Sequence, residues 1–225
     1  MTAEPTRREV PTLDPGVTLL RRPSARSPAL YELVLGELTR SGGRALWVDA
    51  RSNASTYAIT DRAADDRVLD RVRVARAFTA YQHHTLVERL VETVDPGTGL
   101  IVVPCTASLY RDDVPESVGL GLLDASLSIL REVATTFDVP VLVTIADEST
   151  DLQADLVVDA AHREITATET SQGLRFDGAG FETQVYWREG YFQTTIPYWV
   201  DLFGCVCEDA TEAPSPVDLP APLEG

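Results

Sequence analysis

A short apolar run near the middle of the chain constrains the fold more than any other feature. Leu100–Val103 reads L-I-V-V, follows the turn sequence D-P-G, and ends at Pro104. A run that is apolar on both faces is typical of a central strand in a parallel sheet with helices on either side. In open α/β sheets the chemistry lies just past the carboxyl ends of such strands. Here that position is Pro104, which can neither ligate a metal nor accept a proton, so the run predicts the fold more clearly than a catalytic function.

The segments around this run predict an alternation of strands and helices. Further strands are expected at 16–20, 45–48, 72–77, 139–145, 154–158, 164–170, 181–187 and 191–196, with a tight turn at 188–190. Apolar residues at helical spacing predict helices at 28–41, 86–94 and 118–137, the first with Ser27 as its N-cap. The pattern indicates an α/β fold with a mostly parallel central sheet flanked by helices, and antiparallel strands at the C-terminal end.

The length supports one such domain. With 225 residues the chain can bury one full α/β core, which we place at 16–204. Residues 1–15 are polar and contain three prolines, which predicts a flexible N-terminal arm. Residues 205–225 are acidic and proline-rich, which predicts a disordered tail.

The balance of acidic and basic residues indicates a protein adapted to high salt, and it says little about whether the partner is a nucleic acid. Asp and Glu number 35 against 19 basic residues, all of them arginine, and the formal net charge is −16. This composition resembles proteins of salt-in halophiles, above all the haloarchaea. At molar salt the Debye length is only about 3 Å, so the acidic surface is weak evidence against a nucleic-acid partner. No stretch has the length of a membrane span and the N-terminus is polar, which favours a cytoplasmic protein.

The cysteines and histidines do not predict a metal site. Cys205 and Cys207 could offer two thiolates, but structural zinc ligands normally come in spaced pairs. His83 and His84 are neighbours, and on a helix they point about 100° apart, too far to chelate one ion together. Cys105 is interpreted as a small core residue.

Three stretches resemble one known family, the archaeal RadA recombinases of the RecA superfamily. Val74–Phe78 (V-A-R-A-F) and the helix after it are similar to that family's A-R-A-[FY] strand and following helix. Leu100–Arg111 resembles its second nucleotide-binding strand, and Val139–Thr144 its V-x-V-V-x-T-N-Q strand. The resemblance covers about residues 16–200 and implies a RecA-like P-loop NTPase core, in a degenerate, RadB-like paralogue.

The chain departs from this family at every position that handles nucleotide. A phosphate loop G-x-x-x-x-G-K-[ST] uses glycine amides, a lysine and a hydroxyl. The corresponding stretch contains neither glycine nor lysine, and its polar residues are Arg21, Arg22, Ser24, Arg26 and Ser27.

Three further positions also differ. Pro104 stands where the resemblance implies the Walker B aspartate, no glutamate closely follows Asp49, and Ile145-Ala146 replaces the Asn-Gln pair. Since one lost electrostatic contact typically costs about 10²-fold in rate, the joint loss predicts a protein that is not an enzyme and uses no ATP or magnesium cofactor.

Several residues keep a binding interpretation open. Arg21, Arg22 and Arg26 precede a helix N-terminus, where they are either a remnant anion contact or solvated loop arginines. Arg76 and Arg111 are candidate nucleic-acid or partner contacts, although the acidic residues after Arg111 oppose binding to phosphate. Aromatic residues gathered at 186–199 could stack bases or pack between a hairpin and the sheet.

The resemblance and the departures together predict a non-catalytic pseudo-ATPase. By resemblance it would act as an accessory or regulatory factor in DNA recombination or repair through protein–protein contacts, with a recombinase, a repair protein or its own copies as the partner. Direct nucleic-acid binding and membrane association are not expected. Two alternatives stay open: a regulatory scaffold unrelated to DNA, related to the KaiC branch of the same fold, and an ATP-binding protein with an unorthodox phosphate loop.

Overall fold

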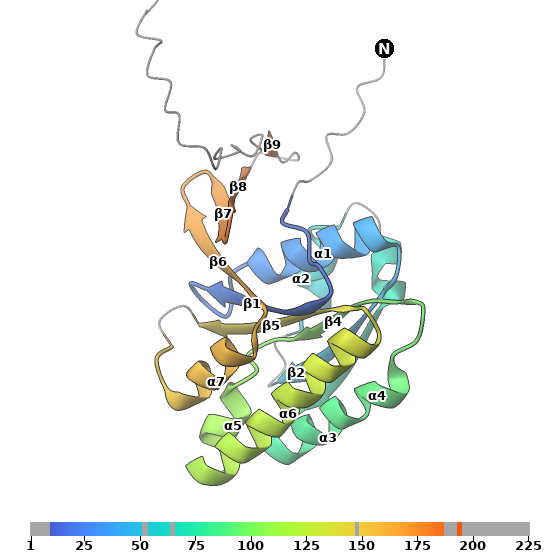
Figure 1. Ribbon diagram of the computed structural model, residues 1–225. Helices are drawn as coiled ribbons and strands as arrows, with labels where there is room; N and C mark the ends of the chain where they lie inside the picture. The colour runs from blue at the N-terminus through green and yellow to red at the C-terminus, as the bar shows by residue number, and fades with distance from the viewer. Residues whose placement is uncertain (1–9, 51–53, 64–65, 147–148, 187–192, 195–225) are drawn as a thin grey trace, which may run out of the picture.

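One continuous sheet runs through the molecule between two layers of helices (Figure 1). The computed structural model describes residues 10–50, 54–63, 66–146, 149–186 and 193–194. Within these residues the sheet has nine strands in the order β3-β2-β4-β5-β1-β6-β7-β8-β9. The strands are β1 (Gly16–Arg22), β2 (Arg44–Ala50), β3 (Val72–Ala77), β4 (Thr98–Val103), β5 (Pro140–Ala146), β6 (Arg163–Thr170), β7 (Gly173–Gly178), β8 (Phe181–Tyr186) and β9 (Gln193–Thr194).

The sheet is parallel from β3 to β6 and antiparallel beyond it. Every pair in β3-β2-β4-β5-β1-β6 is parallel, whereas β6 with β7, β7 with β8, and β8 with β9 are antiparallel. This confirms the predicted α/β class with its mostly parallel central sheet and antiparallel C-terminal strands. The predicted central run Leu100–Val103 lies within β4 and is fully buried.

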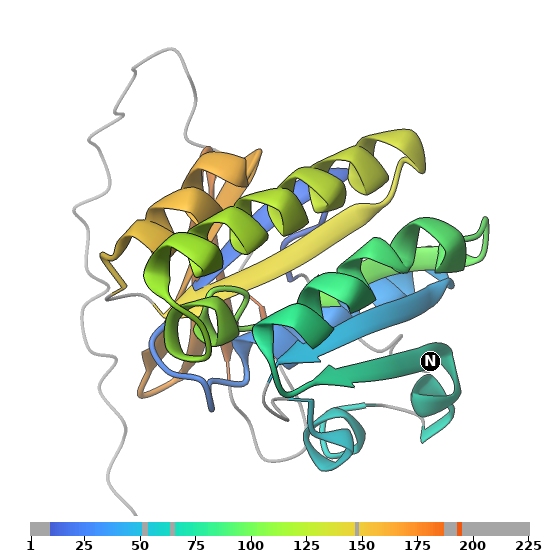
Figure 2. The same cartoon turned by 90° about the horizontal axis from the view of Figure 1, so that it is seen from below.

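The helices divide between the two faces of the sheet. One face carries α1 (Ala29–Ser41), α2 (Thr56–Thr60) and the 3₁₀ turn η1 (Asp66–Arg71). The other carries α3 (Ala80–Glu88), α4 (Leu90–Thr93), α5 (Ser108–Asp112), α6 (Glu116–Thr136) and α7 (Leu152–Ala160). Figure 2 shows α3, α6 and α7 side by side across this second face. Each face buries its own apolar cluster, because a parallel strand is covered on both sides.

Helix α1 ends as its sequence predicts but begins differently. Gly42 adopts a left-handed φ of 68° and donates its N–H to the Leu38 carbonyl, as glycine does after a helix C-terminus. At the other end Pro28 is the N-cap and no side chain caps the helix, so the prediction that Ser27 is the cap was wrong. The Ser27 side chain is instead buried, and its hydroxyl has no hydrogen-bond partner among the described residues.

Two elements of the C-terminal third were also predicted wrongly. Residues 154–158 form part of α7, not a strand, because Asp151 accepts the Ala154 N–H at the N-cap and because β5 and β6 run in parallel with β1, which requires a crossover between them. Strand β7 was missed altogether, although its Leu174 and Phe176 alternate into the core. The predicted turn at 188–190 lies outside the described residues.

The ends of the chain are described only in part. Of the predicted N-terminal arm, residues 10–15 are described. Leu13 in this stretch is fully buried and belongs to the apolar cluster on the α1 face of the sheet. The predicted tail at 205–225, with Cys205 and Cys207, lies outside the described residues. Among the helices that are described, none is both long enough and apolar enough to cross a membrane.

Candidate functional site at the carboxyl edge of the sheet

The carboxyl ends of β1, β4 and β5 meet at one edge of the sheet. Strand β5 lies between the other two, so the loop after β1 and the turn after β4 face each other across its end. The sequence predicted a degenerate phosphate loop in the first and a degenerate Walker B position in the second. The structure brings the two together, because Arg22 Nη2 lies 3.2 Å from Cys105 Sγ, beside Pro104.

Arg22 is a buried cation at this edge. Only 2 % of the residue is exposed, and its guanidinium donates to the Ala25 carbonyl and to Cys105 Sγ, both at 3.2 Å. Its Nε has no hydrogen-bond partner, and no carboxylate of the described residues forms an ion pair with it. A charged group is rarely buried without a counter-ion, because its desolvation is not repaid. The β1–α1 loop thus encloses an arginine side chain of its own.

The other predicted loop residues have separate environments. Arg21 points to the opposite face of β1 and forms an ion pair of 2.5 Å with Glu164 of β6. The Ser24 carbonyl accepts the Ser27 N–H at 3.1 Å, which tightens the loop, and the Ser27 hydroxyl is buried without a partner. Arg26 is exposed. Only Arg22 and Ser27 therefore lie inside the loop.

The turn after β4 holds Cys105 in a fixed position. Pro104 is buried, and Cys105 follows it with a φ of 52°, a left-handed conformation that is uncommon outside glycine. The Cys105 N–H donates to Thr144 Oγ1 of β5 at 2.9 Å, and the Thr106 hydroxyl donates to the Val103 carbonyl at 2.6 Å. Cys105 is partly exposed, so the interpretation of it as a core residue was wrong. No sequence pattern linked Cys105 to Arg22, although the position just past a buried strand is where sites form in such sheets.

Arg76 is held by a buried carboxylate rather than left free. Its Nε lies 3.4 Å from Oδ2 of Asp49, which is completely buried, and its guanidinium also donates to the Ala54 carbonyl. Asp49 Oδ1 accepts the Ala54 N–H at 2.9 Å. The pair joins β2, β3 and the start of α2, so Arg76 has a structural role besides the predicted contact role.

Arg111 is also paired. Its Nη2 lies 2.5 Å from Oδ2 of Asp151, the N-cap of α7. Burial raises the pKa of Asp151, but the hydrogen bonds from Arg111 and from the Ala154 amide outweigh burial and leave that pKa below its ordinary value. Arg111 thus ties α5 to α7, and the structure places it apart from Arg76.

A buried polar chain joins α3, α5 and α6. His83 Nδ1 lies 2.7 Å from the Tyr110 hydroxyl, and that hydroxyl lies 2.8 Å from Ser126 Oγ, which His84 Nδ1 also approaches at 2.8 Å. Burial lowers the pKa of His83 to about 4 and raises that of Tyr110 to about 12. The two histidines therefore share a hydroxyl network, and the described residues contain no group of three potential metal ligands.

Exposed aromatic side chains and two arginines lie on β3 and α3. We call Arg73, Phe78, Tyr81 and Arg89 the β3–α3 surface. Phe78 and Tyr81 are 63 % and 57 % exposed, and Arg73 and Arg89 form no ion pair among the described residues. A pocket of about 320 Å³ lies here, lined by Arg76, Tyr81, Gln82, Thr85, Leu86 and Arg89.

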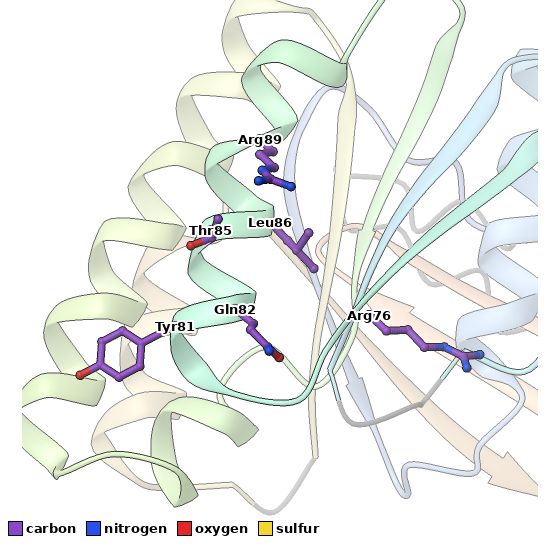
Figure 3. A pocket seen from close by; sticks show the side chains of 6 residues that line it. All are labelled: Arg76, Tyr81, Gln82, Thr85, Leu86 and Arg89. Atoms are coloured by element: carbon purple, nitrogen blue, oxygen red, sulfur yellow. The ribbon is translucent and has the colours of Figure 1, made fainter.

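Figure 3 shows how this pocket is formed. Gln82 and Leu86 point from α3 toward the strand, while the Arg76 side chain extends away from the helix. Gln82 Oε1 accepts the Phe78 N–H at 3.0 Å, which fixes the turn between β3 and α3. Because β3 is the first strand in the sheet order, no described strand pairs with its outer edge.

Comparison with known proteins gives no relative from which a role could be transferred. No family model matches the chain, and no curated protein matches it.

Proposed function

We propose that this protein is a RecA-like pseudo-ATPase that works by binding another protein, as an accessory or regulatory factor in DNA recombination or repair. The observation that carries the binding role is the β3–α3 surface. Within the described residues it combines a strand edge that no other strand pairs with, exposed aromatic side chains, and two arginines that form no ion pair, in a chain of net charge −16. Exposed strand edges pair readily with segments of other chains, and proteins normally protect them.

The arrangement of the sheet supports the RecA-like assignment. A phosphate loop joins a strand to the next helix, and the β1–α1 loop occupies that position. The strand that resembles the Walker B strand, β4, is separated from β1 by β5, and its end still faces the loop through Cys105 and Arg22. This arrangement supports the proposal of a nucleotide-site scaffold that lacks the residues to handle phosphate and magnesium.

The content of the loop supports a non-catalytic role. Arg22 is buried and donates to the Ala25 carbonyl, which supports a loop that is filled by a side chain of the protein and not by a phosphate. Pro104 provides no oxygen for magnesium. This combination favours a protein that keeps the fold of a nucleotide-binding domain but has a function other than nucleotide hydrolysis.

The charges on the β3–α3 surface indicate the chemistry of the partner. Arg73 and Arg89 attract carboxylates, and Phe78 and Tyr81 attract apolar or aromatic side chains. We propose an extended segment with acidic and apolar residues, contributed by a recombinase or a repair protein, which adds to the edge of β3.

The proposal is tested by recovering the protein from its own host at the salt of the cytoplasm. We expect the wild type to recover a recombinase or repair protein, and Phe78→Asp with Tyr81→Asp to lose at least nine tenths of it, because the aromatic contacts are replaced by charges that repel an acidic segment. The control is Leu152→Asp, which places one such charge at a residue 55 % exposed on α7, across α6 from this surface, and is compared with Phe78→Asp and Tyr81→Asp singly as well as together. Recovery that the β3–α3 variants leave unchanged, or a partner from outside recombination and repair, would contradict the proposal.

A second candidate function has one observation in its favour. Arg22 Nε and Ser27 Oγ are both buried without hydrogen-bond partners beside the N-terminus of α1, and no side chain caps that helix. Free helix amides and unpaired donors are the elements of an anion site. This favours the alternative of an ATP-binding protein with an unorthodox loop, which predicts that magnesium-ATP stabilises the fold.

A further inference from the structure

We propose that Cys105 is a reactive thiol that hydrogen peroxide oxidises to sulfenic acid, with Arg22 as its counter-ion. This inference concerns the thiol of Cys105 and does not depend on the partner proposed for the β3–α3 surface. It rests on the juxtaposition of a partly exposed sulfur and a buried cation.

The first argument is that no carboxylate of the described residues forms an ion pair with Arg22. The guanidinium is 98 % buried, its hydrogen-bond partners are a carbonyl and the sulfur, and its Nε has none. Of the two atoms that it contacts, only the sulfur can become an anion. Because a buried positive charge strongly favours a nearby negative one, Arg22 stabilises negative charge on Cys105 Sγ.

The second argument is the access and position of the sulfur. Cys105 keeps part of its surface exposed, while the Thr144 hydroxyl holds its backbone N–H at 2.9 Å. Reactive cysteines lie in partly exposed positions beside cationic side chains, whereas structural ones are enclosed in apolar surroundings. Cys105 is partly exposed and lies beside a cationic side chain, as reactive cysteines do.

The reaction balances with peroxide as the only oxidant. The thiolate sulfur attacks one peroxide oxygen, so that an S–O bond forms and the O–O bond breaks. The displaced hydroxide takes the proton of the transferred oxygen and leaves as water, and the sulfur has lost two electrons to the peroxide. The sulfenate oxygen that remains carries the negative charge beside the Arg22 guanidinium.

The test is the rate at which the Cys105 thiol is lost to hydrogen peroxide at pH 7, in full-length protein with Cys205→Ser and Cys207→Ser. The reference is the same protein unfolded in urea, where a thiol is only a few per cent thiolate. We expect the folded protein to react at least tenfold faster, and trapping with a sulfenate-specific reagent to label Cys105. A folded protein that reacts no faster than the unfolded chain would overturn the proposal.

Two variants then distinguish the effect of the Arg22 charge on the oxidation rate from the effect of folding. Arg22→Gln should bring the rate of the folded protein down to that of the unfolded chain, and Arg22→Lys should keep part of the acceleration, because it keeps the charge. If Arg22→Gln reacts as fast as the wild type, the arginine is not the cause and the proposal fails. Should Arg22→Gln not fold, the comparison of folded and unfolded wild type still decides.

Discussion

Replacing Gly119 by alanine is expected to lower the free energy of unfolding by about 3 kcal/mol, a severe case of overpacking. A Cβ at this position of α6 would lie 2.0 Å from the Tyr110 carbonyl oxygen. A backbone atom cannot turn aside as a side chain can, so α5 and α6 must separate. That movement also stretches the hydrogen bond between Tyr110 and Ser126.

Gly121 provides a matched control on the same helix. No heavy atom lies within 4 Å of a Cβ built there, and the residue is exposed. Gly121→Ala should therefore raise stability by about 0.5–1 kcal/mol through helix propensity alone. Denaturant titrations of both variants measure the difference, and equal stabilities would show that α5 and α6 do not meet as described.

Acidification is expected to destabilise the protein through His83. The pKa of this imidazole is about 4 when folded, against an ordinary value of 6.5, because burial disfavours the charged form. The unfolded chain therefore binds a proton that the folded one does not, and stability falls as the pH drops from 6.5 toward 4. Between pH 7 and pH 5 the loss from this group is about 2 kcal/mol.

The hydrogen bonds explain why His83 resists a proton. The Ser126 hydroxyl donates to the Leu122 carbonyl, so Tyr110 must donate to Ser126 and accept from His83 Nδ1. The added proton would have to sit on His83 Nε2, which is buried and has no acceptor.

The check is a series of denaturant titrations at constant salt. His83→Asn keeps a donor near the position of Nδ1 and cannot be protonated, so it should lose about 2 kcal/mol less than the wild type between pH 7 and pH 5. Parallel curves for the two proteins would contradict the assigned role of His83.

Sequence patterns predicted the strands of the parallel sheet well because burial on both faces leaves a clear signal. Val72–Ala77 is β3 in full, and Leu100–Val103 lies inside β4. Residues 154–158 were predicted as a strand because β-branched residues occur in strands as well as in buried helices. The deciding signal was Asp151, the N-cap three residues before Ala154. Strand β7 escaped notice because only Leu174 and Phe176 mark it between polar neighbours.

The sequence predicted where the candidate site lies, but not which side chains fill it or which partners they contact. The loop after β1 and Pro104 were singled out from the sequence, and the fold places them at one edge. The burial of Arg22 was not predictable, because an arginine after a strand is usually exposed and the enclosing contact comes from Cys105, 83 residues away. Arg76 and Arg111 were predicted as possible nucleic-acid or partner contacts, and carboxylates distant in sequence pair with both.

We propose that this edge of the sheet keeps the form of a nucleotide site, with Arg22 in the place of the phosphate. Thermal melts with and without magnesium-ATP test it most directly, in about 2 M KCl to screen the acidic surface. An ATP-binding recombinase in the same buffer is the positive control.

For a ligand at 100 times its dissociation constant, the gain of about 2.7 kcal/mol corresponds to a rise of about 5–10 °C in a domain of this size. Our account predicts that magnesium-ATP leaves the melting temperature of this protein within about 1 °C of its value without ligand, a small fraction of that rise. A rise that grows with ATP concentration, and that Arg22→Gln abolishes, would contradict the account and assign the β1–α1 loop as a working phosphate site.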